Sequence, residues 1–267
     1  MNPTLTSEDV QQRLQTQWLG RPCVFHQEVD STNTLAAKLA DEGMPHGLVV
    51  AAESQSQGRG RMRRSWHSPT GLNLYFSVLL RPSWNLQSSP PLSIAAGVAI
   101  AEAVQQIVTE SPQLKWPNDV LCGGRKVAGV LVEAAAQRQQ IKHVVLGIGV
   151  NVNQCEFPPE LAERATSLSL ASGKHWLDRA EVLALLLGRL EHWIDSLAQD
   201  SGDGVIERWC SFAPWLGSEV RVTHGDTSIT GMAIAIEPSG ELRLRDEHGH
   251  EHLIHCGDAS GVMGWTY

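Results

Sequence analysis

The sequence lacks the features of secreted, membrane-spanning and zinc-knuckle proteins. Its five cysteines are scattered, odd in number and without a Cys-x-x-Cys pair, which argues against a disulfide framework or a zinc site. No cationic start precedes an apolar run at the N-terminus, so no signal peptide is expected. The strongest apolar runs, Val144–Val150 and Val182–Leu187, are too short to span a bilayer. We therefore expect a cytoplasmic protein with reduced thiols.

An excess of positive charge is also missing. Acidic residues outnumber basic residues, 29 to 21, and the formal net charge is −8. A protein of this charge is not built overall to coat nucleic acid or an anionic membrane. We therefore expect no DNA partner and no membrane partner, and any strongly basic local stretch would stand out as a site.

The length of 267 residues allows one large domain and one small domain. Residues 1–214 combine helical and strand patterns, which predicts an α+β domain with a mixed β-sheet flanked by helices. The expected helices are Ser7 to about Trp18, Thr34–Ala40, Leu92–Val108 and Arg179–Gln199. The expected strands are Cys23–Val29, Leu48–Glu53, Leu72–Leu80, Gln113–Trp116, Lys126–Ala134 and Ile141–Val150, with a hairpin turn at Gly123-Gly124.

From Trp215 the pattern changes to short alternating apolar runs separated by turn residues. This pattern predicts a small all-β barrel over residues 215–267. Four histidines cluster there: His248, His250, His252 and His255. Alternate positions on a strand can bind a metal. However, Gly249 favours an exposed turn, and no cysteine or carboxylate completes an evident metal site.

The most informative segment is the basic stretch Gly58–Arg64, which holds four arginines in an otherwise acidic protein. Its two glycines allow positive φ angles and a close approach to a ligand. Backbone N–H groups and guanidinium forks in such a loop can cradle phosphate or carboxylate. A solvated surface loop is about equally favoured by composition alone. An RNA-binding loop also fits, but no aromatic platform interleaves the arginines, and Trp66 only follows them.

Three further segments carry moderate signals. In Lys115–Asp119 the proline extends the preceding residue, so Asn118 and Asp119 lie at a strand tip, as ligand-binding groups or as an Asx-turn. Lys126 begins an apolar strand, where it can face a developing negative charge or extend into solvent. The glycines of Gly147–Asn153 leave room for a flat ring, such as a nucleobase, or mark a bulge.

In combination and in order, six segments resemble the motifs of the biotin protein ligases, also called biotin–[acetyl-CoA-carboxylase] ligases. They are Asp30–Asn33, Ala52–Arg61, Ser68–Tyr75, Lys115–Asp119, Arg125–Gly129 and Gly147–Asn151. Six motifs in family order are far more specific than any one motif. The resemblance implies a ligase-type catalytic domain followed by a small SH3-like β-barrel.

The resemblance also implies a reaction. In that family biotin and ATP form biotinyl-5′-adenylate and pyrophosphate, and the biotinyl group then passes to a lysine of the biotin carboxyl carrier protein. Mg²⁺ would arrive with ATP, near Asp119, and no metal site made by protein alone is expected. Family members include monomers and dimers, so a homodimer is one alternative.

Residue roles follow from the same resemblance. The biotin ureido ring would be bound by Ser31, Thr32 and Gln55, with Asn33 adjoining. The loop that closes over the intermediate would contain Gly58, Arg59, Gly60 and Arg61. The nucleotide or its Mg²⁺ would be held by Asn118, Asp119 and Asn151, and adenine would pack on Trp66. Gly129 would lie in the binding site. The catalytic groups would be Lys126, at the carboxylate and α-phosphate, and Arg59 and Arg61.

Three departures from the family pattern matter. Arg63 stands where family members often have glycine, and we expect it to stiffen the loop or add charge. Gly257–Val262 resembles the family's C-terminal motif only loosely, with Val262 in place of an arginine, so no catalytic role is assigned there. About 28 residues precede Asp30, too few for a helix-turn-helix domain of roughly sixty residues. We therefore expect a ligase without repressor activity.

Two rival functions stay open at this point. A lipoate or octanoate ligase shares the fold but needs an apolar tunnel, whereas Ser31, Thr32, Asn33 and Gln55 favour a ureido ring. A non-catalytic biotin sensor or RNA-binding module is the rival from another class. Lys126 and Lys115–Asp119 count against RNA binding.

Overall fold

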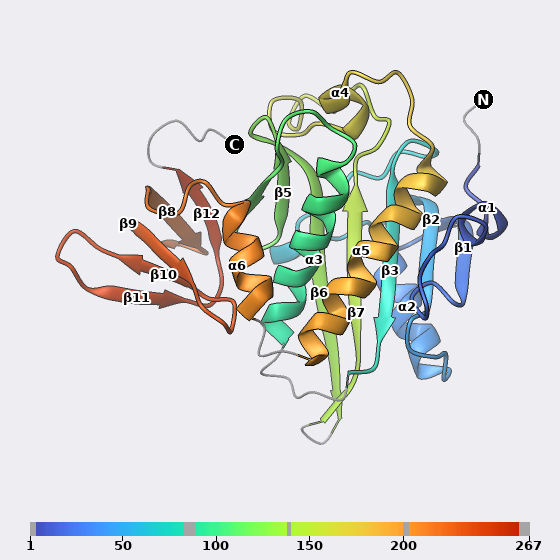
Figure 1. Ribbon diagram of the computed structural model, residues 1–267, viewed down its shortest axis with the longest axis horizontal. Coiled ribbons are helices and arrows are strands. Elements are labelled where there is room, and N and C mark those ends of the chain that lie inside the picture. Colours follow the sequence, from blue (N-terminus) through green and yellow to red (C-terminus); the bar gives the residue numbers. More distant parts are fainter. Residues whose placement is uncertain (1–3, 83–88, 138–139, 200–202, 262–267) are drawn as a thin grey trace.

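The centre of the larger domain is a seven-stranded mixed sheet (Figure 1). The computed structural model describes residues 4–82, 89–137, 140–199 and 203–261. The strand order is β1-β2-β3-β7-β6-β5-β4, and only the β1–β2 pair is parallel. The strands are β1 Cys23–Val29, β2 Val49–Gln55, β3 Leu74–Leu80, β4 Gln113–Lys115, β5 Asp119–Cys122, β6 Arg125–Gln137 and β7 Gln140–Val150. The predicted mixed sheet is confirmed.

Helices flank both faces of this sheet. α3 (Ser89–Gln105) and α5 (Arg179–Gln199) cover one face with α6 (Asp203–Ser211) beside them, and α2 (Thr32–Asp41) lies on the other face (Figure 1). One face of α5 carries an apolar stripe that is buried: Leu183, Leu186, Leu187 and Leu190 are at most 1% exposed. Burial of each such side chain contributes about 1.5–3 kcal/mol to folding. The stripe therefore fixes α5 against α3 and the sheet.

The N-terminal helix was predicted too long. α1 spans only Ser7–Gln11, not Ser7 to Trp18. The reason is a competing acceptor: the backbone N–H groups of Gln17, Trp18 and Leu19 donate to the Glu191 carboxylate of α5 at 2.7–2.8 Å. Because these N–H groups bond to a side chain, this segment does not continue the helix. The short helix α4 (Leu168–Ser172) and α6 were not predicted from sequence.

The predicted hairpin turn is confirmed between β5 and β6. Gly123 and Gly124 both have positive φ, 55° and 73°, the pair of angles that a tight two-residue hairpin requires. This turn sets the register of β5 against β6, so that Asp119 lies opposite Gly129. Asn118 and Asp119 consequently lie at the tip where β4 turns into β5, as the sequence predicts.

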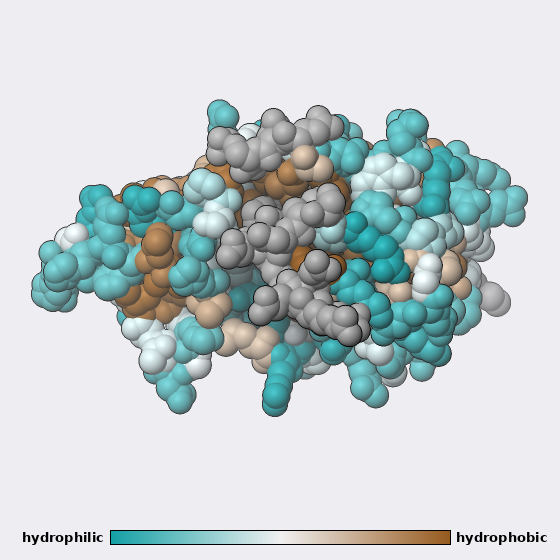
Figure 2. Space-filling model, turned by 90° about the horizontal axis from the view of Figure 1, so that it is seen from below, coloured by the Kyte–Doolittle hydropathy of each residue, from teal (hydrophilic) through white to brown (hydrophobic). Residues whose placement is uncertain are grey.

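The small domain is a five-stranded antiparallel sheet, which is consistent with an SH3-like fold. Its strands are β8 Glu219–His224, β9 Thr227–Ile236, β10 Leu242–Arg245, β11 Glu251–Ile254 and β12 Asp258–Gly261. The expected small all-β, SH3-like domain is confirmed, although the strands that the structure describes form an open sheet, because the edge strands β11 and β12 do not pair. Apolar surface gathers at this end of the molecule (Figure 2), where Met232 and Leu253 are exposed.

The clustered histidines of the small domain contact carboxylates of the same domain. His252 Nε2 lies 2.8 Å from Asp246, which also accepts the backbone N–H groups of His248 and His250. His255 pairs with Glu241 at 3.1 Å. Within the described ranges, no group of three or more His, Cys, Asp or Glu side chains is arranged to hold a metal ion.

Buried tryptophans join the small sheet to the larger domain. Trp116 donates its indole N–H to Gly240 at 2.9 Å, and Trp215 donates to Leu114 at 2.7 Å. Trp215 also packs edge-on against Trp209 of α6. These contacts hold β12 next to the β4–β5 hairpin, so the small domain reaches the candidate site described below.

Among the helices that the structure describes, none combines the length and the apolar composition that a membrane span requires.

Candidate active site

One cavity, of about 620 Å³, gathers the residues of the sequence motifs. It is bounded by the start of α2, the basic loop, strands β5–β7, the loop after β7 and strand β12. Every site residue that the sequence predicts lines it except Gly58: Ser31, Thr32, Asn33, Gln55, Arg59, Gly60, Arg61, Trp66, Asn118, Asp119, Lys126, Gly129 and Asn151. A Cβ on Gly58 would lie 2.5 Å from the Trp66 carbonyl, so this glycine lets the ends of the loop meet.

A neutral, hydrogen-bonding end forms at the start of α2. Ser31 is the N-cap residue, but its side chain does not cap the helix. Thr32 donates its N–H and hydroxyl to Gln55 Oε1 at 2.9 and 3.2 Å, and Gln55 donates to Ser68. Behind them Ser77 is fully buried and lies 2.8 Å from the Thr32 hydroxyl. Sequence reasoning missed Ser77, because nothing in an apolar strand shows which of its side chains faces a distant helix.

Asn33 is held on both sides of its carboxamide. Its Nδ2 donates to Glu133 at 2.7 Å, and its Oδ1 accepts from Ser77 at 2.6 Å. A Cβ on Gly147 would lie 2.1 Å from Asn33 Oδ1, so the room above this glycine is filled by Asn33. Glu133 was missed from the sequence, although a lone carboxylate in the apolar strand β6 is the signal that points to it.

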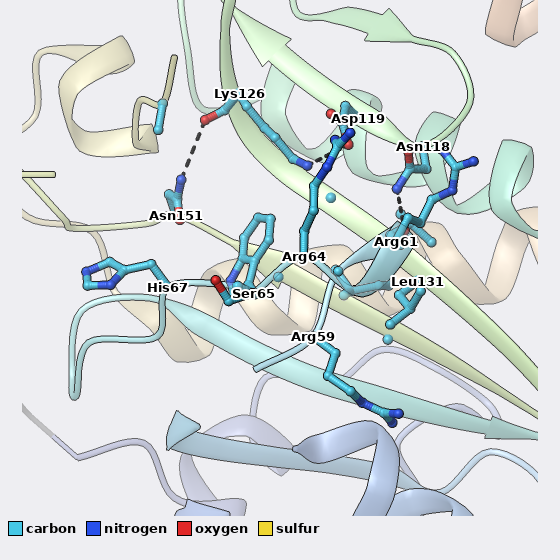
Figure 3. A pocket seen from close by; sticks show the side chains of 18 of the residues that line it. Arg59, Arg61, Arg64, Ser65, His67, Asn118, Asp119, Lys126, Leu131 and Asn151 are labelled. Carbon is cyan, nitrogen blue, oxygen red and sulfur yellow. Dashed lines mark hydrogen bonds and ion pairs between the residues drawn. The ribbon is translucent and has the colours of Figure 1, made fainter. Parts of the chain in front are cut away.

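Carboxylates hold the arginines of the basic loop. Arg59 pairs with Glu133 at 3.0 Å and points away from Lys126 (Figure 3). Arg61 donates to Asn118 Oδ1 and the Gly257 carbonyl at 3.2 Å. Arg61 also lies 3.5 Å from Asp258, which Arg64 contacts as well. The C-terminal motif, to which the sequence assigned no role, therefore supplies the carboxylate that holds the loop.

The tip of the basic loop has an unusual backbone. Met62 and Arg63 both have positive φ, 54° and 60°, in the left-handed region that favours glycine. Each non-glycine residue in this region costs about 1 kcal/mol or more. The glycine that the family pattern leads us to expect at the Arg63 position would fit the conformation found here, and Arg63 adopts it at a cost.

We expect Arg63→Gly to stabilise this loop conformation by about 1 kcal/mol, since glycine adopts positive φ without the Cβ penalty. Hydrogen–deuterium exchange of residues 58–66 should slow by about fivefold. Arg64→Gly is the comparison, because Arg64 has φ −70° and ψ 150°, gains nothing from glycine and loses its contact with Asp258, so exchange should not slow in that variant. Faster exchange in Arg63→Gly than in the wild-type chain would contradict the assignment of strain.

Lys126 and Asp119 form the charged centre of the cavity. Lys126 Nζ lies 2.6 Å from Asp119 Oδ1 and 5.2 Å from the centroid of the Trp66 ring (Figure 3). Asn151 donates its amide to the carbonyls of Thr166 at 3.0 Å and Lys126 at 3.5 Å. It thus fixes the backbone of Lys126. Lys115 also lines the cavity, and burial is the main cause that lowers its pKa.

Trp66 occupies the space above the strand glycines. A Cβ on Gly149 would lie 2.4 Å from its ring and one on Gly129 3.1 Å away. The flat ring over these strand glycines is therefore the indole of Trp66. Its buried N–H has no hydrogen-bond partner among the described residues. Burying an unpaired donor is costly, so a ligand acceptor placed here would gain a hydrogen bond.

The cavity fits a magnesium ion that arrives with a nucleotide. Mg²⁺ prefers oxygen ligands and is commonly held by one or two carboxylates together with substrate phosphates. Asp119 supplies a carboxylate next to the amide of Asn118. Two acidic side chains, Asp119 and Asp258, line the cavity, and both are already paired with cations, so a metal held by protein groups alone does not fit.

The sequence of this chain is similar to those of known biotin protein ligases. The family model of the Biotin/lipoate A/B protein ligase family matches residues 25–151, and that of the Biotin protein ligase C terminal domain matches residues 215–260. The biotin–[acetyl-CoA-carboxylase] ligase of Mycobacterium tuberculosis is 35% identical, over 86% of this chain and 85% of that protein. The bifunctional ligase/repressor BirA of Bacillus subtilis is 34% identical, over 92% of this chain and 76% of that protein.

The fold of this chain is also similar to that of a biotin protein ligase of known structure. The biotin protein ligase of Aquifex aeolicus, in complex with biotin and ATP, superposes with a TM-score of 0.76 at 35% identity, over 89% of this chain and 97% of that one. Both family models match in order, and the likeness extends over most of each relative. This chain is therefore an enzyme of the biotin protein ligase family.

Proposed function

We propose that this chain joins biotin and ATP to form biotinyl-5′-adenylate and pyrophosphate, and then transfers the biotinyl group to a lysine of the biotin carboxyl carrier protein of acetyl-CoA carboxylase. The observation that carries the proposal is one cavity with a neutral end and a cationic centre. Ser31, Thr32 and Gln55 at the neutral end suit a ureido ring. Lys126 and the arginines suit a carboxylate next to a triphosphate.

The cationic centre would reduce the electrostatic repulsion that opposes the first step. A carboxylate and a triphosphate repel each other, and an ammonium and guanidinium groups reduce this repulsion and stabilise charge on the α-phosphate. Lys126 enters from β6 on one side, and Arg61 enters from the loop on the other. Holding both reactants in one cavity also removes the entropic cost of their encounter at the moment of reaction. In this proposal Asn118, Asp119 and Asn151 hold the nucleotide.

The second step needs no nucleophile from this chain. The neutral amine of the carrier lysine attacks the carbonyl of the adenylate. The bond from the carbonyl carbon to the phosphate oxygen breaks, AMP leaves with the electron pair, and the nitrogen releases a proton to solvent as the amide forms. The loop Gly58–Trp66 would exclude water until the carrier arrives, since hydrolysis of the adenylate is the competing reaction. In this proposal residues 1–214 carry the chemistry, and the small domain holds the loop through Asp258 of β12.

Biotin-dependent exchange of labelled pyrophosphate into ATP tests the first step. We expect exchange with biotin and, at equal concentration, at least about a hundredfold less with lipoate or octanoate. Those acids carry no ureido group to bond with Ser31, Thr32 and Gln55, and a site built to hydrogen-bond a ligand discriminates strongly against acids that lack the bonding groups. Preferred exchange with octanoate would assign the chain to the lipoate branch of the family. A chain that binds biotin but gives no exchange would be a sensor and not a ligase.

A further inference from the structure

The short segment Asn151–Gln154, directly after β7, forms one wall of the cavity. Asn151 and Gln154 line it, and all four residues of the segment are buried. The Gln154 side chain donates its Nε2 to the Glu156 carbonyl at 2.8 Å, so its orientation also fixes the chain that follows. What holds this segment in place therefore helps to shape the end of the cavity that the proposed function gives to the nucleotide.

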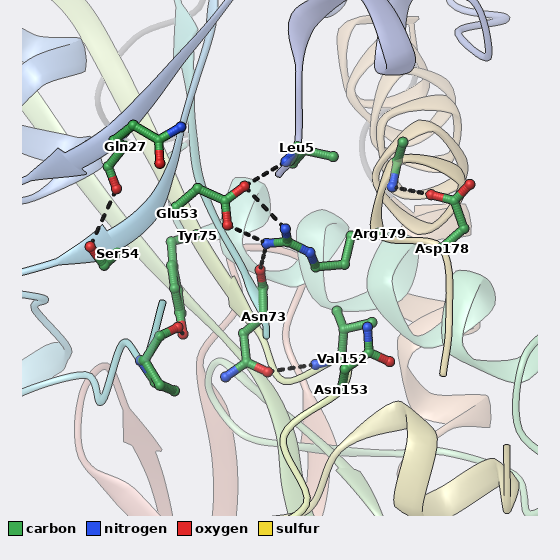
Figure 4. Close-up of polar contacts among 12 residues, drawn as sticks. Leu5, Gln27, Glu53, Ser54, Asn73, Tyr75, Val152, Asn153, Asp178 and Arg179 are labelled. Carbon is green, nitrogen blue, oxygen red and sulfur yellow. Dashed lines mark hydrogen bonds and ion pairs between the residues drawn. The ribbon is translucent and has the colours of Figure 1, made fainter. Parts of the chain in front are cut away.

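Asn73, just before β3, holds the segment from outside the cavity. It is completely buried and does not line the cavity. Its Oδ1 accepts the backbone N–H of Val152 at 2.9 Å (Figure 4), and its Nδ2 donates to Gln154 Oε1 at 2.7 Å. Only a carboxamide both accepts and donates in this way at this size. The two bonds set the position of Val152 and the orientation of the Gln154 amide.

A buried ion pair holds Asn73 in turn. Arg179, at the start of α5, donates to the Asn73 carbonyl at 3.2 Å and makes two bonds to Glu53 of β2, at 2.8 and 3.0 Å (Figure 4). The side chains of Arg179 and Glu53 are 3% and 5% exposed. Glu53 also accepts the backbone N–H of Leu5. A pair this deeply buried and fully bonded is rigid, so it gives Asn73 a fixed support.

We propose that Asn73 is a positioning residue of the ligase reaction, which acts through Gln154 and Val152 on the nucleotide end of the cavity. This inference rests on the proposed function. It predicts that loss of the Asn73 amide weakens the use of ATP and leaves biotin binding intact. The groups expected to bind biotin, Ser31, Thr32 and Gln55, lie at the start of α2 and in β2. In the part of the chain that the structure describes, no hydrogen bond joins them to this segment.

The test is Asn73→Asp in the full chain. The carboxylate keeps the acceptor for Val152 but faces Gln154 Oε1 with a second acceptor. Rotation of the Gln154 amide would relieve that repulsion and lose the bond to Glu156. We expect the KM for ATP in pyrophosphate exchange to rise about tenfold. The Kd for biotin from calorimetry should stay within about twofold of the wild-type value.

Two further variants complete the test: one replaces Asn73→Asp if that variant does not fold, and the other is a control. Gln154→Met leaves Asn73 bonded to Val152 and should raise the KM for ATP about fivefold, so it decides the outcome if Asn73→Asp fails to fold. Thr16→Val is the matched control, because Thr16 is also buried but bonds to the Leu19 carbonyl, which lies outside this segment, and does not line the cavity. It should lower the melting temperature and leave the KM for ATP unchanged.

The possible results distinguish failure of the positioning role from failure of the proposed function. An unchanged KM for ATP in folded Asn73→Asp and in Gln154→Met would overturn the inference, as would an equal rise in Thr16→Val, which would indicate general loosening of the fold. Wild-type protein without any biotin-dependent exchange would overturn the proposed function itself, and the inference with it. Wild-type exchange with no selective effect of the variants would overturn the positioning role alone.

Discussion

Replacing Lys126 by alanine is expected to lower biotin-dependent pyrophosphate exchange by about a thousandfold, the upper range for removing one preorganised charge-stabilising donor. The fold should survive, because the side chain is 31% exposed and contributes little to the core. The melting temperature should therefore stay within about 2 °C of the wild-type value. Exchange kinetics and a thermal melt on the same sample provide the measurement.

The expected size of this effect follows from where Lys126 lies. Its ammonium group is the cation that strand β6 directs into the cavity, and it contacts both Asp119 and the face of Trp66. Its backbone is fixed by hydrogen bonds with Arg164 and Thr166, at 2.8 and 2.9 Å. The charge is therefore held in position before substrates bind, and such preorganisation makes a donor effective in the transition state.

Arg125→Ala provides the matched control for this prediction. Arg125 precedes Lys126 on the same strand, is exposed and does not line the cavity. Removing it changes the net charge by the same amount, so exchange should fall by less than about twofold. A normal exchange rate in Lys126→Ala would remove this lysine from the mechanism, and equal losses in both variants would reduce its role to general electrostatics.

Much of the cavity could be predicted from sequence because its residues lie at positions that local patterns mark. Asn118 and Asp119 follow a strand that Pro117 ends, and Lys126 follows the Gly123-Gly124 turn. Such signals depend on neighbours in the chain, so they are readable without the fold. The same reasoning found the long helix α5, whose apolar stripe repeats at helical spacing.

The carboxylates that hold the arginines could not be predicted in the same way. Glu133 and Asp258 lie 74 and 197 residues from their partners Arg59 and Arg61, and no local pattern links positions so far apart. The sequence pattern also misplaced the end of α1. The backbone N–H groups after this helix bond to Glu191, which belongs to a helix more than 170 residues away. Sequence therefore identified the groups that line the cavity better than the groups that support them.

For Arg61→Ala we expect biotinyl-adenylate to leave the enzyme about a hundredfold faster, while the KM for ATP rises by less than about threefold. The adenylate would be formed with labelled ATP, separated from excess nucleotide and chased with unlabelled intermediate. Its release rate and the KM from exchange are then compared in one preparation. Similar losses in both quantities would contradict a role in closing the loop.

The reason for a selective effect is that Arg61 links the loop to two other parts of the chain. It bonds to Asn118 at the β4–β5 tip and to Gly257 and Asp258 of the small domain. An adenylate phosphate entering the cavity offers this guanidinium a stronger, charged acceptor than the Asn118 amide. Arg61 would then hold the loop over the intermediate, whereas ATP binding to the open cavity depends more on Lys126 and the Asp119 end.

Arg63→Ala separates this role from loss of charge in general. Arg63 belongs to the same loop, is exposed and does not line the cavity. Alanine at this position keeps the strained positive φ and removes only the guanidinium, so adenylate release should stay within about twofold of the wild-type rate. If Arg63→Ala released the adenylate as fast as Arg61→Ala, the retention would come from the positive charge of the whole loop. If only Arg61→Ala did so, retention would depend on the single guanidinium that the small domain and Asn118 hold in place.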